Sequence, residues 1–213
     1  MDIVSSKIEK YLEDCSSDEP QLLQELNQET WQKVLNPLML SGAYQGRLLS
    51  MISKIKSPLN ILEIGTYTGY ATLCLAEGLG ENGMIHTIDI NEELRPIQSK
   101  YFEKSPYNHQ IKQHVGNALE IIPILDVKFD LVFIDADKIN YANYFHAVIN
   151  KMNTGGIILS DNVLWKGKVV EPIALNDFDT KALVSYNKLL KEDPRIETVL
   201  LPIRDGLTIS RVK

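Results

Sequence analysis

The sequence predicts an α/β fold built on a doubly wound, mostly parallel sheet that ends in an antiparallel hairpin. Three observations lead to this prediction. Apolar, β-branched runs alternate with helical patterns from residue 60 onward. The runs at 129–134 and 156–160 end abruptly in acidic or amide side chains, as buried parallel strands do at a ligand-binding edge. Two final strand-like runs are joined by Arg204-Asp205-Gly206, a hairpin-like turn.

The chain is expected to form one domain spanning 1–213, and its N-terminal part, 1–57, is expected to be helical. Apolar residues within Ile8–Leu12 and Leu22–Leu26 fit two helix faces. Ser17–Pro20 is typical of a turn and a helix start. A further helix through Arg47–Ile52 should stop at Ser57-Pro58, because the residue before proline disfavours helix. The α/β core would then occupy 58–213.

From residue 60 the chain alternates strand and helix. We expect strands at Asn60–Ile64, Gly83–Ile90, Gln110–Val115, Phe129–Ile134, Gly156–Ser160, Ile196–Ile203 and Leu207–Val212. The intervening helices are expected at Tyr70 to about Leu79, at Glu92–Lys104, near Tyr141–Met152 and around Thr180–Lys191. Because the alternation comes first and the hairpin last, helices should cover both faces of the sheet.

The composition is that of an ordinary globular protein. Hydrophobic residues make up 44% and charged residues 23%, and the formal net charge of −6 weighs against a large phosphate-binding surface. No apolar run approaches membrane-spanning length, and Met1–Lys7 lacks the pattern of a secretion signal. Cys15 and Cys74 have neither metal nor disulfide spacing, so we expect free thiols in the reducing cytoplasm.

Oxygen-bearing side chains follow two of the predicted strands at the point where each strand ends. Asp135 follows one strand, and Asp161 and Asn162 follow the next. Neighbouring parallel strands would deliver these three side chains to one small space, where their oxygens suit Mg²⁺ or a similar cation. The alternatives are a solvated loop after Asp135 and an Asx turn at Asp161. Because acidic motifs occur at the ends of two neighbouring strands, these alternatives are less favoured than a cation site.

A glycine-bearing turn and an acidic residue suggest that the same edge of the sheet binds a nucleoside. Gly65 and Gly69 follow the first strand, where glycine lets the backbone approach a ligand. Asp89 ends the second strand and can accept hydrogen bonds from ribose hydroxyls. The spacing is G-x-x-x-G, which does not satisfy the dinucleotide motif G-x-G-x-x-G. The turn and the acidic residue together fit a nucleoside-bearing cofactor and do not distinguish NAD from S-adenosylmethionine. The alternatives are a turn that needs glycine for its shape alone and a helix cap at Asp89, although Asn91 suits that capping role equally well.

These motifs resemble those of the cation-dependent O-methyltransferases, the caffeoyl-CoA and catechol O-methyltransferase relatives, and especially their small bacterial members. The resemblance runs from about Met39 to the C-terminus. It rests on Glu63–Gly69, Asp89, Asp135–Tyr141, Asp161–Trp165 and Leu201–Thr208. It implies a Rossmann-like, class I S-adenosylmethionine-dependent methyltransferase sheet of seven strands, in agreement with the strand and helix pattern, and it implies a homodimer.

The resemblance also assigns roles to individual residues. It implies that S-adenosylmethionine binds to Met39, Ser41, Glu63, Gly65, Thr66, Tyr67, Ala71, Asp89, Ala118 and Asp135. Asp135, Asp161 and Asn162 would be the ligands of a divalent cation, and Lys138 would be the general base, with Asp135 as the second catalytic residue. Trp165 and Asp205 are candidates for contact with the substrate.

The implied reaction is methylation of a hydroxyl on a catechol-like or phenylpropanoid-like small molecule, with Mg²⁺ preferred over Mn²⁺ or Ca²⁺. The alternative acceptor is a wobble hydroxyuridine of tRNA. That acceptor would require a basic face, for which the candidates are Arg47, Lys54, Lys56, Lys166 and Lys168. The missing dinucleotide motif disfavours a nicotinamide-dependent oxidoreductase, and the charged cluster around Lys138 disfavours a non-catalytic binding module. No membrane partner is expected.

Three positions depart from the family's pattern. Ala71 stands where many relatives have Ser near the cofactor carboxylate, and Thr72 is a candidate to replace that hydroxyl. Gln45 replaces a frequent Glu, and Arg204 replaces the Gly that usually precedes Asp205. Because Arg204 lies near the expected substrate mouth, the identity of the methyl acceptor does not follow from the resemblance.

Overall fold

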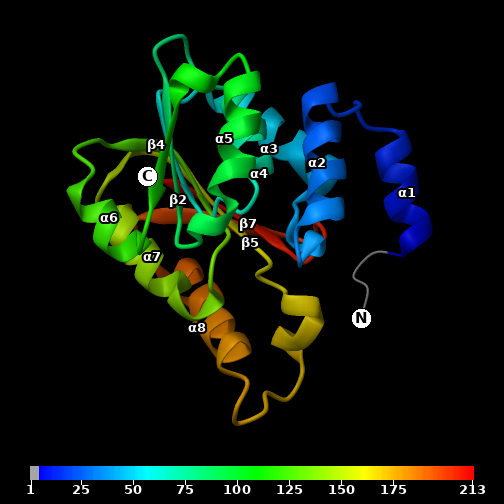
Figure 1. Cartoon of the computed structure of the whole chain (residues 1–213). Helices are drawn as coiled ribbons and strands as arrows, with labels where there is room; N and C mark the ends of the chain where they lie inside the picture. Colours follow the sequence, from blue (N-terminus) through cyan, green and yellow to red (C-terminus); the bar gives the residue numbers. More distant parts are fainter. Residues whose placement is uncertain (1–4) are drawn as a thin grey trace.

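The computed structural model describes residues 5–213 and shows a seven-stranded sheet with helices on both faces (Figure 1). The strands are β1 (Asn60–Ile64), β2 (Met84–Asp89), β3 (Ile111–Val115), β4 (Phe129–Ile134), β5 (Met152–Asp161), β6 (Ile196–Leu201) and β7 (Leu207–Val212). Their order across the sheet is β3-β2-β1-β4-β5-β7-β6. Strands β1 to β5 pair in parallel, and β7 runs antiparallel to both of its neighbours. The predicted sheet with its C-terminal hairpin is confirmed.

Helices form a layer on each side of the sheet (Figure 1). One layer contains α6 (Ala118–Ile124), α7 (Tyr141–Ile149) and α8 (Phe178–Glu192), and the other contains α2 (Gln21–Lys33), α3 (Gly42–Lys56), α4 (Tyr70–Ala76) and α5 (Arg95–Lys104). Helix α1 (Ser6–Asp14) lies outermost, beyond α2. Short 3-10 turns are η1 (Pro37–Met39), η2 (Glu92–Leu94), η3 (Asn108–Gln110), η4 (Lys138–Asn140) and η5 (Trp165–Val170). Across residues 5–213, every helix is too short or too polar to span a membrane.

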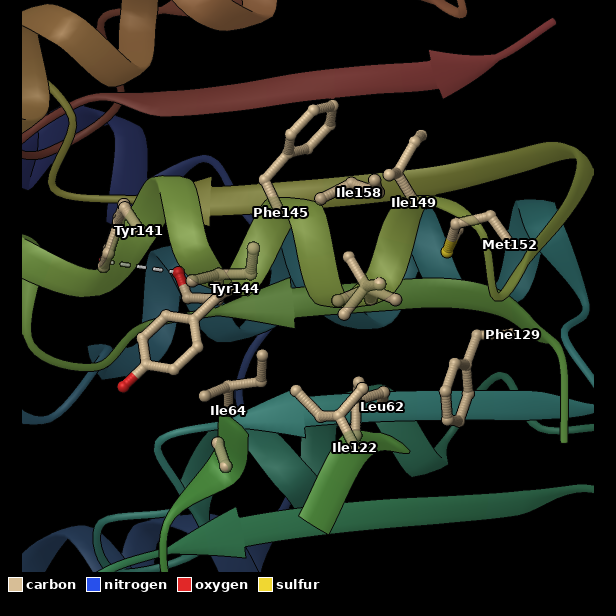
Figure 2. Packing of buried hydrophobic residues seen from close by; sticks show 14 of the residues in the cluster. Leu62, Ile64, Ile122, Phe129, Tyr141, Tyr144, Phe145, Ile149, Met152 and Ile158 are labelled. Carbon is tan, nitrogen blue, oxygen red and sulfur yellow. Dashed lines mark hydrogen bonds between the residues drawn. The ribbon is translucent and has the colours of Figure 1, made fainter. Parts of the chain in front are cut away.

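Two apolar layers hold the helices to the sheet, because successive strand side chains point to opposite faces. Leu62 and Ile64 of β1 belong to the layer beneath α6, α7 and α8, whereas Ile61 belongs to the layer beneath α2 to α5. Figure 2 shows the first layer, in which Phe145 of α7 and Ile158 of β5 belong to the same buried cluster as Leu62 and Ile64 of β1. Burial on both faces explains why the central strands are continuous apolar runs.

Several predicted element boundaries are wrong. Helix α6 is absent from the predicted helices, although Asn117 caps it by accepting a hydrogen bond from the Leu119 N–H. Strand β5 begins at Met152, which pairs with Phe129, so the preceding helix ends at Ile149 rather than Met152.

The helix face predicted at Ile8–Leu12 does not face the core. Ile8 is 53% exposed and Tyr11 is 67% exposed. Residues 1–4, part of the segment considered for a secretion signal, lie outside the described residues.

Candidate active site

The turn after β1 passes directly against the end of β4. These two strands are paired in parallel at the centre of the sheet, where the strand order reverses and α/β proteins place their ligands. Gly65 has a φ of +98°, and a Cβ atom there would lie 1.9 Å from the backbone oxygen of Asp135. Only glycine allows this approach. The turn that carries Thr66 and Tyr67 is therefore held beside Asp135.

A cleft separates this turn from the segment Met39–Ser41. It is lined by Met39, Leu40, Ser41, Gly65, Thr66, Tyr67, Tyr70, Ala71 and Asp135. Most of the predicted cofactor-binding residues are therefore brought together. The Tyr67 hydroxyl donates to the backbone oxygen of Asn36 at 2.8 Å, which ties the turn to the chain leading into Met39.

Glu63 lies beneath this cleft, fully buried in β1. Its Oε2 accepts hydrogen bonds from the hydroxyls of Thr72 and Thr87, whereas its Oε1 has no hydrogen-bond partner within residues 5–213. Burial raises the pKa of Glu63 to about 8. Because buried polar atoms are nearly always hydrogen-bonded, the unpartnered Oε1 atom is a candidate to form a hydrogen bond with a bound molecule. Thr72 gives its hydroxyl to Glu63, so it does not replace the Ser hydroxyl that is missing at Ala71.

Asp89 and Ala118 continue the site along the same edge, after β2 and β3. Asp89 accepts hydrogen bonds from the N–H groups of Tyr67 (2.7 Å) and Asn91 (2.8 Å), one at each carboxylate oxygen. Each oxygen keeps a free lone pair that can accept a hydroxyl. The Asn91 side chain caps η2, so Asp89 is not needed for that role. Ala118 is buried at the first residue of α6.

The ends of β4 and β5 bring Asp135, Asp161 and Asn162 together. The two strands pair side by side up to Ile134 and Ser160. The Lys138 ammonium, from η4, lies between them and donates to Asp135 Oδ1 at 3.0 Å and to Asn162 Oδ1 at 2.9 Å. A positively charged group therefore already bridges two of the three predicted cation ligands.

Asp161 is the most deeply buried member of this cluster. Its Oδ1 accepts from the Asn162 N–H at 2.8 Å, and its Oδ2 accepts from Gln45 Nε2 at 2.7 Å. Burial raises the pKa of Asp161, and the negative charge of Asp135 raises it further. In the described part of the chain, no three His, Cys, Asp or Glu side chains are grouped as a metal site. A cation held by Asp135 and Asp161 would therefore take its third oxygen from the Asn162 amide.

Tyr141 and Gln45 contact the cluster, although the sequence did not identify them as site residues. The Tyr141 hydroxyl donates to the backbone oxygen of Asp161 at 2.9 Å. Since a phenol has one proton, that hydroxyl accepts the hydrogen bond from Lys138 Nζ at 2.5 Å. A buried aromatic residue is usually a packing residue, so the only available signal was its place in the Asp135–Tyr141 motif.

Trp165 and Asp205, the two residues predicted to contact the substrate, occupy different positions. The Trp165 ring centroid lies 5.9 Å from Lys138 Nζ, so Trp165 borders the cluster. The Asp205 carboxylate accepts a hydrogen bond from the Lys166 N–H, and its backbone oxygen accepts one from Leu164. Asp205 therefore holds the loop that carries Trp165.

Comparison with known protein families decides the assignment of the chain. The model of the O-methyltransferase family matches residues 13–213. The chain belongs to this family. The predicted resemblance is thereby confirmed, and so is the predicted enzyme class, an S-adenosylmethionine-dependent O-methyltransferase.

Similar proteins cover nearly the whole enzyme. It is 38% identical to caffeoyl-CoA O-methyltransferase 5 of Nicotiana tabacum over 207 residues, which are 91% of this chain and 85% of the relative. The caffeoyl-CoA O-methyltransferase of Petroselinum crispum is 39% identical and covers 91% of this chain and 84% of its own.

Solved structures agree with this fold. The O-methyltransferase of Bacillus cereus in complex with S-adenosylhomocysteine has a TM-score of 0.89 at 29% identity, covering 97% of both chains. The S-adenosylhomocysteine-bound methyltransferase PaMTH1 of Podospora anserina has a TM-score of 0.89 at 31% identity, covering 97% of this chain and 94% of its own.

Proposed function

We propose that the enzyme methylates a hydroxyl of a catechol-like or phenylpropanoid-like small molecule and requires a divalent cation, with Mg²⁺ preferred over Mn²⁺ or Ca²⁺. The observation that carries this proposal is the meeting of Asp135, Asp161 and Asn162 beside a cleft that Asp135 also lines. The names of the two caffeoyl-CoA O-methyltransferase relatives support an acceptor with a phenylpropanoid group.

The proposed seat of S-adenosylmethionine is the cleft between Met39–Ser41 and the turn after β1. Its walls would contact the methionine part of the cofactor, Asp89 would hold the ribose hydroxyls, and Ala118 would lie beside the adenine. Two features support this fit. Glu63 Oε1 lacks a partner within residues 5–213, and the glycine turn at Gly65 lets a ligand approach the backbone closely.

The proposed cation ligands are the side-chain oxygens of Asp135, Asp161 and Asn162. Two carboxylates and one amide are the donor set that hard divalent cations prefer. The Lys138 ammonium, which contacts Asp135 and Asn162, shows that the space between these oxygens accommodates positive charge. Burial and the negative charge of Asp135 raise the pKa of Asp161, and a divalent cation bound there would favour its ionised form.

In the proposed mechanism, each residue has a distinct task. When bound, the cation would act as a Lewis acid on the substrate hydroxyl, and S-adenosylmethionine would supply the methyl group. Lys138 would first release a proton from its ammonium to solvent and would then, as the neutral amine, accept the hydroxyl proton, because a general base needs a free lone pair within hydrogen-bond reach of that proton. Tyr141 and Asp135 hold Lys138 Nζ in place through their oxygens. Trp165 would pack against the aromatic ring of the acceptor and limit its orientations.

Replacement of Asp161 tests the proposal. Asp161→Ala should reduce cation-dependent methyl transfer to a catechol by roughly 100-fold or more, because it removes a direct cation ligand. The affinity for S-adenosylhomocysteine should change by less than about threefold, since Asp161 is not a wall of the cleft. Turnover is measured with a labelled methyl donor, with and without chelator, and binding by calorimetry.

Asp137→Ala is the matched control for this experiment. Asp137 is an exposed acid in the loop after β4, which also carries Asp135, and it contacts Asn140 and Tyr144 instead of the cluster. This variant should keep its activity. If the wild-type enzyme and Asp161→Ala turn over at the same rate, both with and without chelator, the mechanism does not use a cation.

The tRNA alternative has less support, because three of the five basic residues that it would use are engaged within the protein. Arg47 and Lys54 both pair with Glu77, and Lys168 pairs with Asp177. Phosphate binding would have to compete with these ion pairs. Filter binding with tRNA at two salt concentrations discriminates between the two acceptors.

A further inference from the structure

Arg204 connects the segment that covers the cofactor cleft to the interior of the site. It lies in the turn between β6 and β7, with a φ of +48°. Its guanidinium donates hydrogen bonds to the backbone oxygens of Ser41 and Leu40, the latter at 3.2 Å, and to Gln45 Oε1 at 2.8 Å. Leu40 and Ser41 are walls of the cleft. One side chain therefore anchors the cleft wall to the C-terminal hairpin.

Gln45 carries this connection onward to Asp161. Its Nε2 donates to Asp161 Oδ2 at 2.7 Å while its Oε1 accepts from Arg204. Because the two ends of an amide differ, the Arg204 contact requires the NH₂ group to face the carboxylate. With the amide reversed, an oxygen would face Asp161 and the NH₂ group would face the guanidinium, and both hydrogen bonds would be lost. Gln45 is 1% exposed, so bulk water does not replace either contact.

The two residues that form this connection are also two of the three departures from the family's pattern. A Glu at position 45 would place a second negative charge against the buried Asp161, and a Gly at position 204 would provide no guanidinium. The pair found here instead places a neutral amide against Asp161, backed by a positive charge. Buried carboxylates need such hydrogen bonds and nearby positive charges to remain ionised.

We propose that Arg204 is a positioning residue that, through Gln45, holds the cleft wall at Leu40–Ser41 and the Asp161 carboxylate in one arrangement. This inference rests on the proposed cofactor and cation seats. It predicts that one substitution outside both seats weakens the binding of two different ligands. A residue that merely stabilises the turn would lower stability without that joint effect.

Arg204→Gly is the decisive variant, because glycine adopts the positive φ of this position without strain. The dissociation constant for S-adenosylhomocysteine should rise about tenfold in calorimetry, as expected when charged hydrogen bonds to a binding wall are removed. The Mg²⁺ concentration that half-saturates the thermal shift of the protein should rise by a similar factor. Arg204→Lys, which keeps the charge but reaches fewer of the three acceptors, should give intermediate values for both ligands and serves if the glycine variant does not fold.

A double-mutant cycle with Gln45→Ala tests whether Arg204 acts through Gln45. For Mg²⁺, the double variant should be no weaker than the weaker single variant, because either change breaks the same connection. Arg195→Gly is the control, since Arg195 is an arginine whose guanidinium binds Asp193 ahead of β6. It should leave both affinities unchanged.

The outcomes separate this inference from the proposed function. If the wild-type enzyme binds both ligands and Arg204→Gly binds them equally well, the positioning role is overturned and the proposed function stands. If the Mg²⁺ effects of the two single variants multiply in the double variant, Arg204 does not act through Gln45 and the proposal fails. If the wild-type enzyme binds no S-adenosylhomocysteine and shows no response to Mg²⁺, the proposed seats themselves are wrong.

Discussion

Glu63 is a fully buried carboxyl group whose surroundings favour its protonated form. Burial raises its pKa to about 8, even though the hydroxyls of Thr72 and Thr87 favour the ionised form. In the unfolded chain a Glu titrates near a pKa of about 4.3. Between these two values the folded protein binds more protons than the unfolded chain does. The contribution of Glu63 to the free energy of unfolding is therefore present at low pH and is lost as the pH rises toward 8.

Glu63→Gln removes this titration while nearly preserving the shape of the side chain. From pH 5 to pH 8, the free energy of unfolding of the ligand-free wild-type protein should fall relative to that of the variant, by on the order of 3–5 kcal/mol. Urea unfolding of both proteins at three pH values measures the difference, and other titrating groups cancel in the comparison. Parallel pH profiles would show that Glu63 is not a buried carboxyl group with a raised pKa.

Individual site residues were predictable from the sequence only where a local pattern marks them. Asp135 and Asp161 follow apolar strand runs, and parallel strands end at the same edge of a sheet, so their proximity follows from the pattern. Gln45 and Tyr141 contact the same cluster, and Arg204 reaches it only through Gln45. Their contacts depend on how α3, α7 and the last hairpin pack against each other, and no spacing in the sequence encodes that packing.

At the scale of secondary-structure elements, the close contact between the turn after β1 and the end of β4 is expected to have a large effect on stability. Gly65→Ala places a methyl group on the backbone oxygen of Asp135, and backbone atoms cannot turn aside as side chains do. We expect a loss of unfolding free energy of at least about 3 kcal/mol and a loss of S-adenosylhomocysteine binding. Urea unfolding and calorimetry measure the two effects.

Gly42→Ala isolates the contribution of backbone conformation. Gly42 also has a positive φ, +77°, but no atom lies within 4 Å of the position of its absent Cβ among the described residues. Gly42→Ala should lower the free energy of unfolding by only about 1–2 kcal/mol, the usual penalty of the left-handed conformation for a residue with a side chain. If the two alanine variants lose equal stability, the contact with β4 has no energetic weight.

Elements were predictable in proportion to the length and continuity of their apolar runs. The bounds of β1 and β4 agree with the sequence because each is a mostly apolar run that contains β-branched residues. Helix α6 has 7 residues, which is less than two turns, and it contains Pro123, so its sequence is too short to show a clear helical repeat. The first half of β5 is polar around Asn153–Gly155, which conceals strand pairing that backbone hydrogen bonds supply.

At the scale of the whole molecule, the predictions of a single domain, a cytoplasmic location and a homodimer stay predictions. Large apolar side chains are exposed on the edge strand β6, where Val199 is 59% exposed and Leu200 is 39% exposed. Helix α3 likewise exposes Met51 and Ile55. An unpaired strand edge with apolar side chains is a surface that a second subunit could cover.

The bridge that Lys138 makes between Asp135 and Asn162 has a consequence for the stability of the protein in the absence of the proposed cation. The acidic strand ends carry an internal countercharge, so folding does not depend on an external one. Chelation should abolish turnover yet lower Tm by no more than about 2–4 °C, the shift that corresponds to about 1 kcal/mol in a chain of this size. Lys138→Met, which lacks the countercharge, should melt lower in chelator and recover with Mg²⁺ in calorimetric scans.

If chelation lowers the Tm of the wild-type enzyme and of Lys138→Met by the same amount, the Lys138 ammonium does not protect the protein from loss of the cation. With that protection, an enzyme that requires Mg²⁺, as proposed, would persist as an intact, inactive molecule and would regain activity when the ion returns.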